Sequence, residues 1–355
     1  MKTTKFPTEL KEPAGLALAL ASLLLVAYHV RYLVLTNYGS VAARSAWVDA
    51  FYFVSGLGHQ AFTVYFVVQG WVLAGRLRER RHCRSVFVLK AAGTYAMLLP
   101  VLLLGLLLDG TGSRYLNRTG LYTAFPDFAV LSLDAPTLLG QLLLVQPFAV
   151  PTFGTNGVLW VLAFEWWYSC LFLLLSWLMR QRRALAWGML AALAGALLAG
   201  FPSEFVNWGL IWLLGVAVAY ARTRVPLALA LPVFLLTLVL SRYMESQSAW
   251  LLGPNGLAFS FLKDSTFAAG FALLLLALRR GGGRLTPSFS TAVFFGHFPL
   301  MMFIIALGAR WQPLKQQPGA ASLLWFVLAT LLIYLCGWVL YRALLYCIRD
   351  GADGR

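Results

Sequence analysis

Five residues with ionisable side chains fall inside or beside strongly apolar stretches, and they are the main candidates for chemistry: His29, His59, Lys90, Glu165 and His297. An ionisable group inside a bilayer is costly, so each one is by default a functional-site hypothesis. A histidine beside a carboxylate is the minimum for general-base catalysis, because the carboxylate fixes the imidazole tautomer and stabilises the imidazolium that forms. His29 and Glu165 therefore predict an acid–base pair.

Structural interpretations of the same residues stay open. His29 can be a buried histidine that is hydrogen-bonded across helices, and Glu165 can be the partner of an arginine or a tyrosine. His59 stands at the start of a predicted helix, and we interpret it as structural. No dinucleotide-binding fingerprint, Walker loop, nucleophile elbow or zinc-binding spacing of Cys and His is found.

The composition indicates which elements must position these residues. Of 355 residues, 60% are hydrophobic and only 12% are charged, whereas ordinary soluble domains carry about 25% charged residues. The net charge of +15 does not indicate a nucleic-acid partner, because the basic residues lie between apolar segments. We predict an all-α, polytopic integral membrane bundle that forms a single domain over residues 1–355.

The apolar segments predict about ten membrane-spanning helices, since a spanning helix needs about 17 to 25 residues. Their predicted positions are 14–36, 59–75, 86–109, 157–179, 184–200, 205–221, 225–241, 257–278, 289–309 and 321–346.

The distribution of Lys and Arg predicts the orientation, because these residues accumulate in cytoplasmic loops. With the N-terminus inside, most of them, including the run Arg76 to Arg84, fall on the cytoplasmic side. Both termini are then cytoplasmic, with an N-terminal segment at 1–13 and a tail at 347–355. The longest loop, 110–156, is extracytoplasmic. Its uncharged part, Pro136 to Val150, is a candidate half-helix.

This topology also predicts depths, at a rise of about 1.5 Å per residue. His29 and Glu165 lie about 10 Å and about 12 Å from the outer face, which allows them to be neighbours. Lys90 and His297 lie about 6 Å and about 12 Å from the inner face and predict a second pair.

Four stretches in order along the chain carry recognisable motifs. They are LLLVAYHV, ending one residue after His29; GHQAFTVYFVVQGWVLAGR at 58–76; NGVLWVLAFEWWYSCLF at 156–172; and SFSTAVFFGHFPL at 288–300. These stretches resemble motifs of the acyltransferase type 3 family. Gln69 stands where the family usually has Ser, Leu18 where it has Arg and Gly15 where it has Asp, while its basic pair in the third span is reduced to Lys90.

The resemblance implies transfer of an acyl group, most often acetyl from acetyl-CoA, to a hydroxyl of a carbohydrate or lipid-linked glycan at the cell envelope. In that reaction His29 is the general base, and Glu165 orients it or binds the acceptor. The other implied roles are acceptor binding by Asn156, Trp160 and Tyr168, and binding of the acyl-CoA donor by Lys90, His297 and Arg76. No metal is implied.

Two other classes of function remain open. A bundle of about ten helices with His and Glu near mid-membrane is compatible with a proton-coupled transporter of an envelope precursor, although the sequence shows no repeated halves. A non-catalytic membrane scaffold is the third reading. For all three we expect a multi-pass protein of a bacterial inner membrane, with the oligomeric state open.

Overall fold

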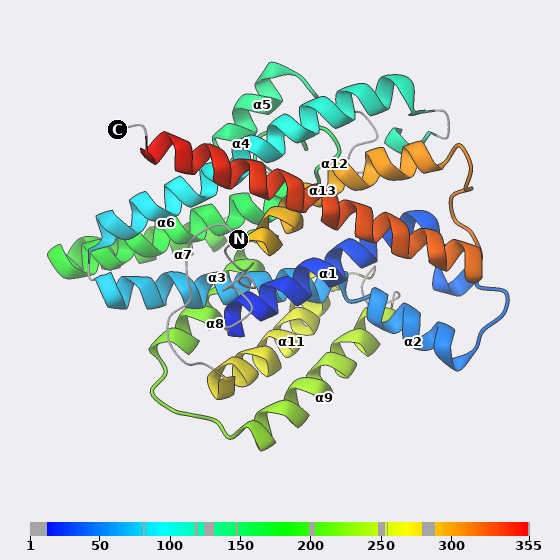
Figure 1. Cartoon of the computed structure of the whole chain (residues 1–355). Helices are drawn as coiled ribbons and strands as arrows, with labels where there is room; N and C mark the ends of the chain where they lie inside the picture. Colours follow the sequence, from blue (N-terminus) through cyan, green and yellow to red (C-terminus); the bar gives the residue numbers. More distant parts are fainter. Residues whose placement is uncertain are drawn as a thin grey trace. The chain divides into compact units, whose positions relative to one another are not determined.

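The chain is an all-α polytopic membrane protein (Figure 1). Its computed structural model describes residues 13–80, 82–117, 120–123, 131–146, 148–198, 203–247, 253, 255–278 and 288–353. The described residues form helices, two short 3-10 turns and two isolated β-bridges. An α-helix satisfies its backbone hydrogen bonds within one segment, which is the requirement that a bilayer imposes.

The helices agree closely with the predicted spans. Each of the ten predicted segments corresponds to one long helix, and α2 and α5 are additional short helices. The bounds are α1 Pro13–Val34, α2 Ala46–Ser55, α3 Gly58–Arg80, α4 Cys83–Tyr115, α5 Ala135–Leu142, α6 Leu159–Gln181, α7 Arg183–Leu198, α8 Ser203–Tyr220, α9 Leu227–Ser246, α11 Gly256–Leu278, α12 Phe289–Gly308 and α13 Ala320–Asp353.

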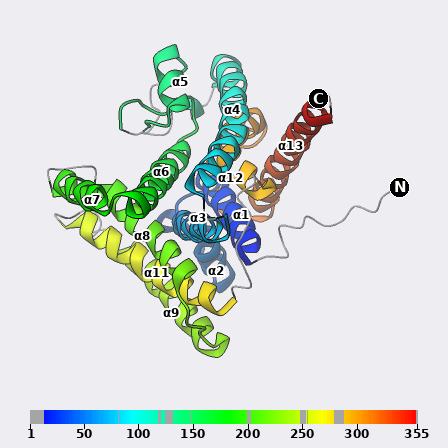
Figure 2. The same cartoon turned by 90° about the vertical axis from the view of Figure 1, so that its left-hand side faces the viewer.

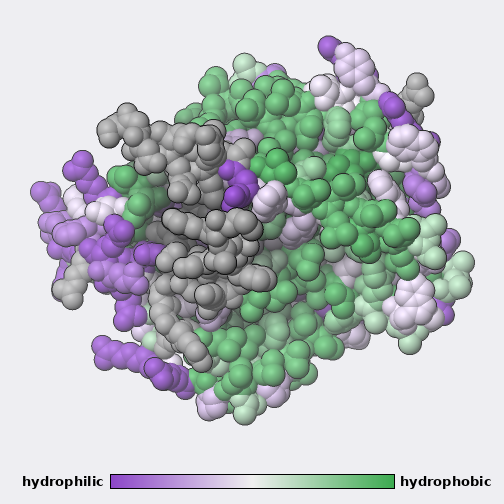
Figure 3. All heavy atoms as spheres, in the orientation of Figure 1, coloured by the Kyte–Doolittle hydropathy of each residue, from purple (hydrophilic) through white to green (hydrophobic). Residues whose placement is uncertain are grey.

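Nine segments within the described residues are long and apolar enough to cross a membrane. α7, with 16 residues, is shorter than the rest, so the prediction of about ten spans holds with this helix as the marginal one. Most of the surface visible in Figure 3 belongs to hydrophobic residues. Large exposed side chains such as Leu236, Leu331 and Leu335 have the character of lipid-facing positions.

The chain divides into two compact units, which are described separately. Unit 1 comprises Met1–Ala21, His59–Gly93 and Phe164–Thr286, and unit 2 comprises Ser22–Gly58, Thr94–Ala163 and Pro287–Arg355. In unit 1, α11 lies beside both α9 and α8 (Figure 2). In unit 2, α12 packs along α13 (Figure 1).

The predicted loop 110–156 contains more helix than we expected. α4 continues to Tyr115, whereas we predicted that this span ends at residue 109. Hydropathy marks where polar residues begin, but a helix needs only its backbone hydrogen bonds to continue. α5 confirms a short helix in this loop, but it ends at Leu142 and so covers only the first half of the candidate stretch Pro136 to Val150. Asp134 caps it by accepting a hydrogen bond of 2.8 Å from the Thr137 N–H, and this bond holds the pKa of Asp134 below its usual value.

Helices α3 and α8 of unit 1 approach each other closely at two glycines. A Cβ atom at Gly70 would collide with the Trp212 carbonyl oxygen, and one at Gly215 would collide with the Val67 carbonyl oxygen. Small residues at such crossings let helix backbones pack tightly in a membrane. The two glycines therefore set the separation of α3 and α8.

We expect Gly70→Ala or Gly215→Ala to destabilise the protein by about 1 to 3 kcal/mol, because the added methyl group can only be accommodated by moving a backbone. Gly188 in α7 has open space around it, so Gly188→Ala is the matched control. Thermal unfolding of the purified protein in detergent measures the effect. Equal melting temperatures for Gly70→Ala and Gly188→Ala would show that the α3–α8 crossing does not limit stability.

Candidate functional site

The strongest arrangement in unit 2 is a pair of histidines on α1 and α12. His29 Nδ1 lies 3.0 Å from His297 Nε2, and the two rings are nearly parallel, with centroids 5.2 Å apart and an interplanar angle of 18°. His297 is fully buried, whereas His29 is half-buried. Tyr28 and Phe298 pack against the His29 ring.

The hydrogen bonds of this pair fix its tautomers. His297 Nδ1 lies 2.8 Å from the Phe294 carbonyl oxygen and 3.2 Å from that of Val293. A carbonyl oxygen only accepts, so His297 Nδ1 carries the proton and Nε2 carries the lone pair. Nε2 of His297 then accepts from His29 Nδ1–H. His29 Nε2 is left as an unprotonated nitrogen, which is the state a general base requires.

Asn156 supports the helix that carries His297. Pro299 has no N–H, so the Phe295 carbonyl four residues earlier loses its bond within α12. Asn156 Nδ2 donates to that carbonyl oxygen at 2.8 Å. The side chain is 2% exposed, and its Oδ1 has no hydrogen-bond partner within the described part of the chain. Nδ2 of Asn156 therefore stabilises α12, whereas Oδ1 is still available for the predicted contact with the carbohydrate substrate.

Asp109 of α4 holds the turn that precedes Asn156. Its carboxylate accepts from the Thr155 N–H at 2.7 Å and from the Thr155 hydroxyl at 2.9 Å. Gly154 has a φ of +60°, and a Cβ atom there would collide with the Asp109 carboxylate. A charged residue at the end of a predicted span thus fixes the backbone from which Asn156 extends.

The C-terminal end of α1 is held by the connection between α12 and α13. Leu35 and Gln316 form a β-bridge, and the Lys315 ammonium donates to the Tyr32 carbonyl oxygen. Burial, together with the nearby Arg31 charge, lowers the pKa of Lys315. These contacts fix α1 near the helix that bears His297.

We expect Asn156→Ala to cost about 1 to 3 kcal/mol, because it leaves the Phe295 carbonyl buried without a donor. In a Pro299→Ala background the same change should cost much less, since the restored backbone N–H can bond that carbonyl. Thermal unfolding of the four proteins of this double-mutant cycle measures the coupling. Asn37→Ala, at an exposed position without a side-chain cap bond, is the control. Additive effects would contradict the assignment.

Unit 1 contains one residue from each of the two predicted pairs, Lys90 and Glu165. The Lys90 ammonium on α4 forms an ion pair with the Glu165 carboxylate on α6. Ser169 donates to the second carboxylate oxygen of Glu165 at 2.9 Å. Lys90 is 7% exposed and Glu165 is fully buried. The pair satisfies both charges in a setting where a single charge would be costly.

The hydrogen-bond partners therefore differ from those predicted from depth. We paired His29 with Glu165 and Lys90 with His297, whereas the bonds join His29 to His297 and Lys90 to Glu165. The pairs were assigned from depth, yet each bond joins a residue predicted nearer the outer face to one predicted nearer the inner face, so depth counted along the helices did not predict the contacts. The direction in which a side chain leaves its helix also selects the partner, and counting residues does not give it. The catalytic role of Glu165 stays a prediction.

The remaining predicted site residues, Tyr168, Trp160 and Arg76, make separate contacts and do not form a common group with one another. The Tyr168 hydroxyl donates to the Phe205 carbonyl at 2.5 Å, and its ring packs against Phe205, with centroids 4.6 Å apart. Tyr168 is thus bound in the core of unit 1. Trp160 is half-buried in the first turn of α6. Arg76 forms an i,i+3 ion pair with Glu79 at 3.5 Å. Acceptor binding by Trp160 and donor binding by Arg76 stay predictions.

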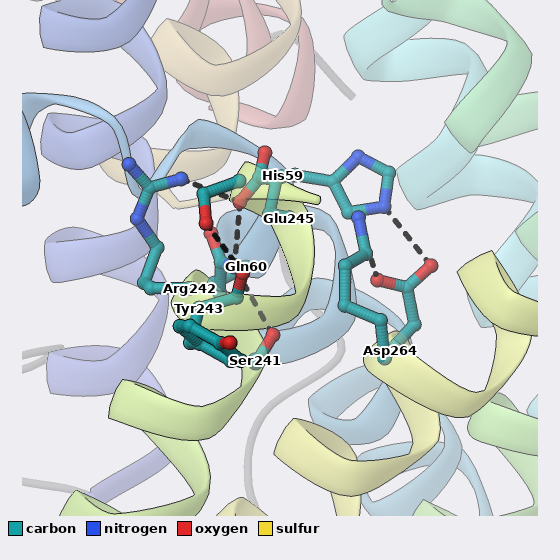
Figure 4. Close-up of polar contacts among 9 residues, drawn as sticks. His59, Gln60, Ser241, Arg242, Tyr243, Glu245 and Asp264 are labelled. Carbon is teal, nitrogen blue, oxygen red and sulfur yellow. Dashed lines mark hydrogen bonds and ion pairs between the residues drawn. The ribbon is translucent and has the colours of Figure 1, made fainter. Parts of the chain in front are cut away.

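The sequence analysis named His59 but missed its partners. His59 Nε2 lies 3.0 Å from Asp264 Oδ2 on α11 (Figure 4). Lys263 Nζ lies 3.4 Å from Asp264 Oδ1. Lys263 and Asp264 are both buried. The signal was present, because both lie inside the predicted span 257–278. The sequence analysis did not include these two charges among the intramembrane candidates.

In unit 2 the geometry thus leaves one imidazole nitrogen, His29 Nε2, in the state that a general base requires. In unit 1 it pairs two buried carboxylates, Glu165 and Asp264, with basic side chains. Comparison with models of known protein families, with curated proteins and with solved structures found no match to this chain.

Proposed function

We propose that the chain is a membrane acyltransferase that transfers an acyl group, most readily acetyl, from acyl-CoA to a hydroxyl of a cell-envelope carbohydrate. The observation that supports it best is the chain of hydrogen bonds from the Phe294 carbonyl through His297 to His29. These hydrogen bonds leave a lone pair on His29 Nε2. The ordered sequence motifs around His29, Glu165 and His297 point in the same direction.

The proposed chemistry uses His29 as the catalytic base. A sugar hydroxyl is a poor nucleophile near neutral pH. Nε2 takes its proton while the oxygen attacks the thioester carbonyl. The new C–O bond forms, the C–S bond breaks, and the protonated imidazole returns the proton to the CoA thiolate. Proton transfer of this kind contributes about 10² to 10⁴ in rate.

His297 has a different place in this proposal from the donor binding predicted from sequence. It is a positioning residue, since it accepts from His29 Nδ1–H and orients Nε2. It also stabilises the imidazolium by accepting a stronger, charge-assisted bond. Lys90 is ion-paired with Glu165, so its attraction for CoA phosphates is reduced. The predicted donor contact then rests mainly on Arg76 and the neighbouring basic residues.

The experiment is incorporation of radiolabelled acetyl from acetyl-CoA into envelope glycan. Inverted and right-side-out vesicles are prepared from a bacterial strain with and without this protein. We expect label in the glycan only with the protein present, and only where acetyl-CoA reaches the cytoplasmic face. Equal incorporation by both strains would overturn the proposal in favour of a transporter or scaffold. Incorporation of label into the glycan when acetyl-CoA is supplied only on the external face would overturn the prediction that the donor binds from the cytoplasmic side.

A further inference from the structure

A polar cluster in unit 1 lies outside the proposed acyl-transfer chemistry. We call it the α3 cluster. His59 points to Asp264 on α11, whereas Gln60 points to Ser241 and Glu245 on α9 (Figure 4). Thr63 follows one turn later on α3. At about 100° per residue, its side chain leaves the helix in a direction between those of His59 and Gln60.

The orientation of the Gln60 amide is fixed by its neighbours. Nε2 lies 3.1 Å from a Glu245 carboxylate oxygen and 3.2 Å from Ser241 Oγ. A carboxylate only accepts, so the nitrogen must face Glu245. Gln60 is 3% exposed, and its Oε1 has no hydrogen-bond partner within the described residues.

Thr63 presents a second such atom. It is 1% exposed, and its hydroxyl has no hydrogen-bond partner in the described part of the chain. Buried polar groups in native proteins are nearly always hydrogen-bonded, so two neighbouring exceptions on one helix face require an explanation. A ligand that enters beside the half-exposed His59 would supply the partners.

The charges of the α3 cluster indicate what kind of ligand this is. Lys263 balances Asp264, and Arg242 balances Glu245 at 2.5 Å. His59 Nε2 donates to Asp264, because a carboxylate accepts, which leaves Nδ1 of the neutral imidazole with a lone pair. With a neutral imidazole, the α3 cluster thus offers two hydrogen-bond acceptors, Gln60 Oε1 and His59 Nδ1, and the Thr63 hydroxyl. This set suits a neutral ligand with several O–H groups.

We propose that the α3 cluster is a binding site for a neutral polyol, such as a free sugar or the sugar headgroup of a glycolipid. One ligand hydroxyl donates to Gln60 Oε1, and a second hydrogen-bonds Thr63 Oγ1. His59 accepts from a third at the exposed side. The site goes beyond the proposed acyl transfer and does not depend on it, since none of its groups takes part in the chemistry at His29.

The test uses the full chain in nanodiscs with D-glucose as the probe, and binding is followed by saturation-transfer difference NMR. Thr63→Val removes the hydroxyl at nearly constant shape and breaks no bond within the described protein, so the variant should fold. We expect its glucose affinity to be about 3- to 10-fold lower, the effect of one lost hydrogen bond. Thr266→Val on α11, whose hydroxyl donates to the Leu262 carbonyl, is the matched control and should bind as the unaltered protein does.

Two further arms separate the possible outcomes. His29→Ala should bind glucose normally even if it has no transferase activity, so failure of one proposal does not imply failure of the other. A glucosyl diacylglycerol added to the nanodisc should compete with glucose if the ligand is a lipid headgroup, and should not if it is a free sugar. Absence of glucose binding, or equal affinity in Thr63→Val, would overturn the proposal and is the result expected if only water occupies the cluster.

Discussion

Replacing His29 by alanine should lower the rate of acyl transfer by about 10² to 10⁴ while the protein stays folded and membrane-inserted. The reason is that Nε2 of His29 is the unprotonated nitrogen that the bond within the histidine pair does not use, since the lone pair of His297 Nε2 accepts from His29 Nδ1–H. Initial rates of labelled acetyl transfer, normalised to the amount of folded protein, measure the effect. His82→Ala, in the exposed connection between α3 and α4, is the matched control and should retain full activity.

The partner histidine provides a separate check on the same assignment. His297→Gln keeps an oxygen that can accept from His29 Nδ1–H, whereas His297→Leu does not. We expect the leucine variant to lose more activity than the glutamine variant, together with a changed pH–rate profile. Turnover at the unaltered rate by His29→Ala would rule out His29 as the base. Loss of folded protein in that variant would instead indicate a structural role.

Replacing Glu165 by glutamine should destabilise unit 1 by about 3 to 5 kcal/mol, because it leaves the Lys90 ammonium buried without its counter-charge. Lys90→Met should have a similar effect by isolating the Glu165 carboxylate. The measurement is the melting temperature of the purified protein, together with the fraction that elutes as a monodisperse peak from size-exclusion chromatography.

The double variant Lys90→Met with Glu165→Leu separates structure from catalysis. Removing both partners of a buried ion pair is often neutral or stabilising, so we expect stability to recover. If transfer activity recovers as well, the pair is structural and the predicted catalytic role of Glu165 is wrong. If the protein is stable but inactive, that role is supported. Full stability of the single Glu165→Gln variant would contradict the ion-pair account.

Much of the fold could be predicted from the sequence because apolar segment length and helix length are tied together in a bilayer. The predicted span 289–309 and the helix Phe289–Gly308 illustrate this agreement. The two compact units could not be predicted, because hydropathy does not say which helices pack together. The end of α4 at Tyr115 was not predicted, because polar residues mark the membrane boundary and not the end of the helix.

The candidate site was predictable in its members and not in its pairs. His29 and His297 were both identified as costly intramembrane groups, yet they were assigned to different depths and to different partners, whereas the structure joins them directly. The bond from Asn156 to Phe295 has a sequence signal in Pro299, since a proline inside a helix always frees a carbonyl. The identity of the donor is not contained in that signal. Asp264 was overlooked because the search for intramembrane groups did not include it, although it lies inside the predicted span 257–278.

The contacts of His297 also determine the order in which the protein can mature during synthesis. His29 and His297 are 268 residues apart, and Asn156 and Phe295 are 139 residues apart. All the helices that precede α12 are therefore synthesised before His297, the partner of His29, exists. A nascent chain that ends before α12 contains the proposed base, His29, without the residue proposed to orient it, His297. Truncations that remove only the C-terminal helices should be as inactive as those that remove α1, and activity should arise only after the last spans enter the bilayer.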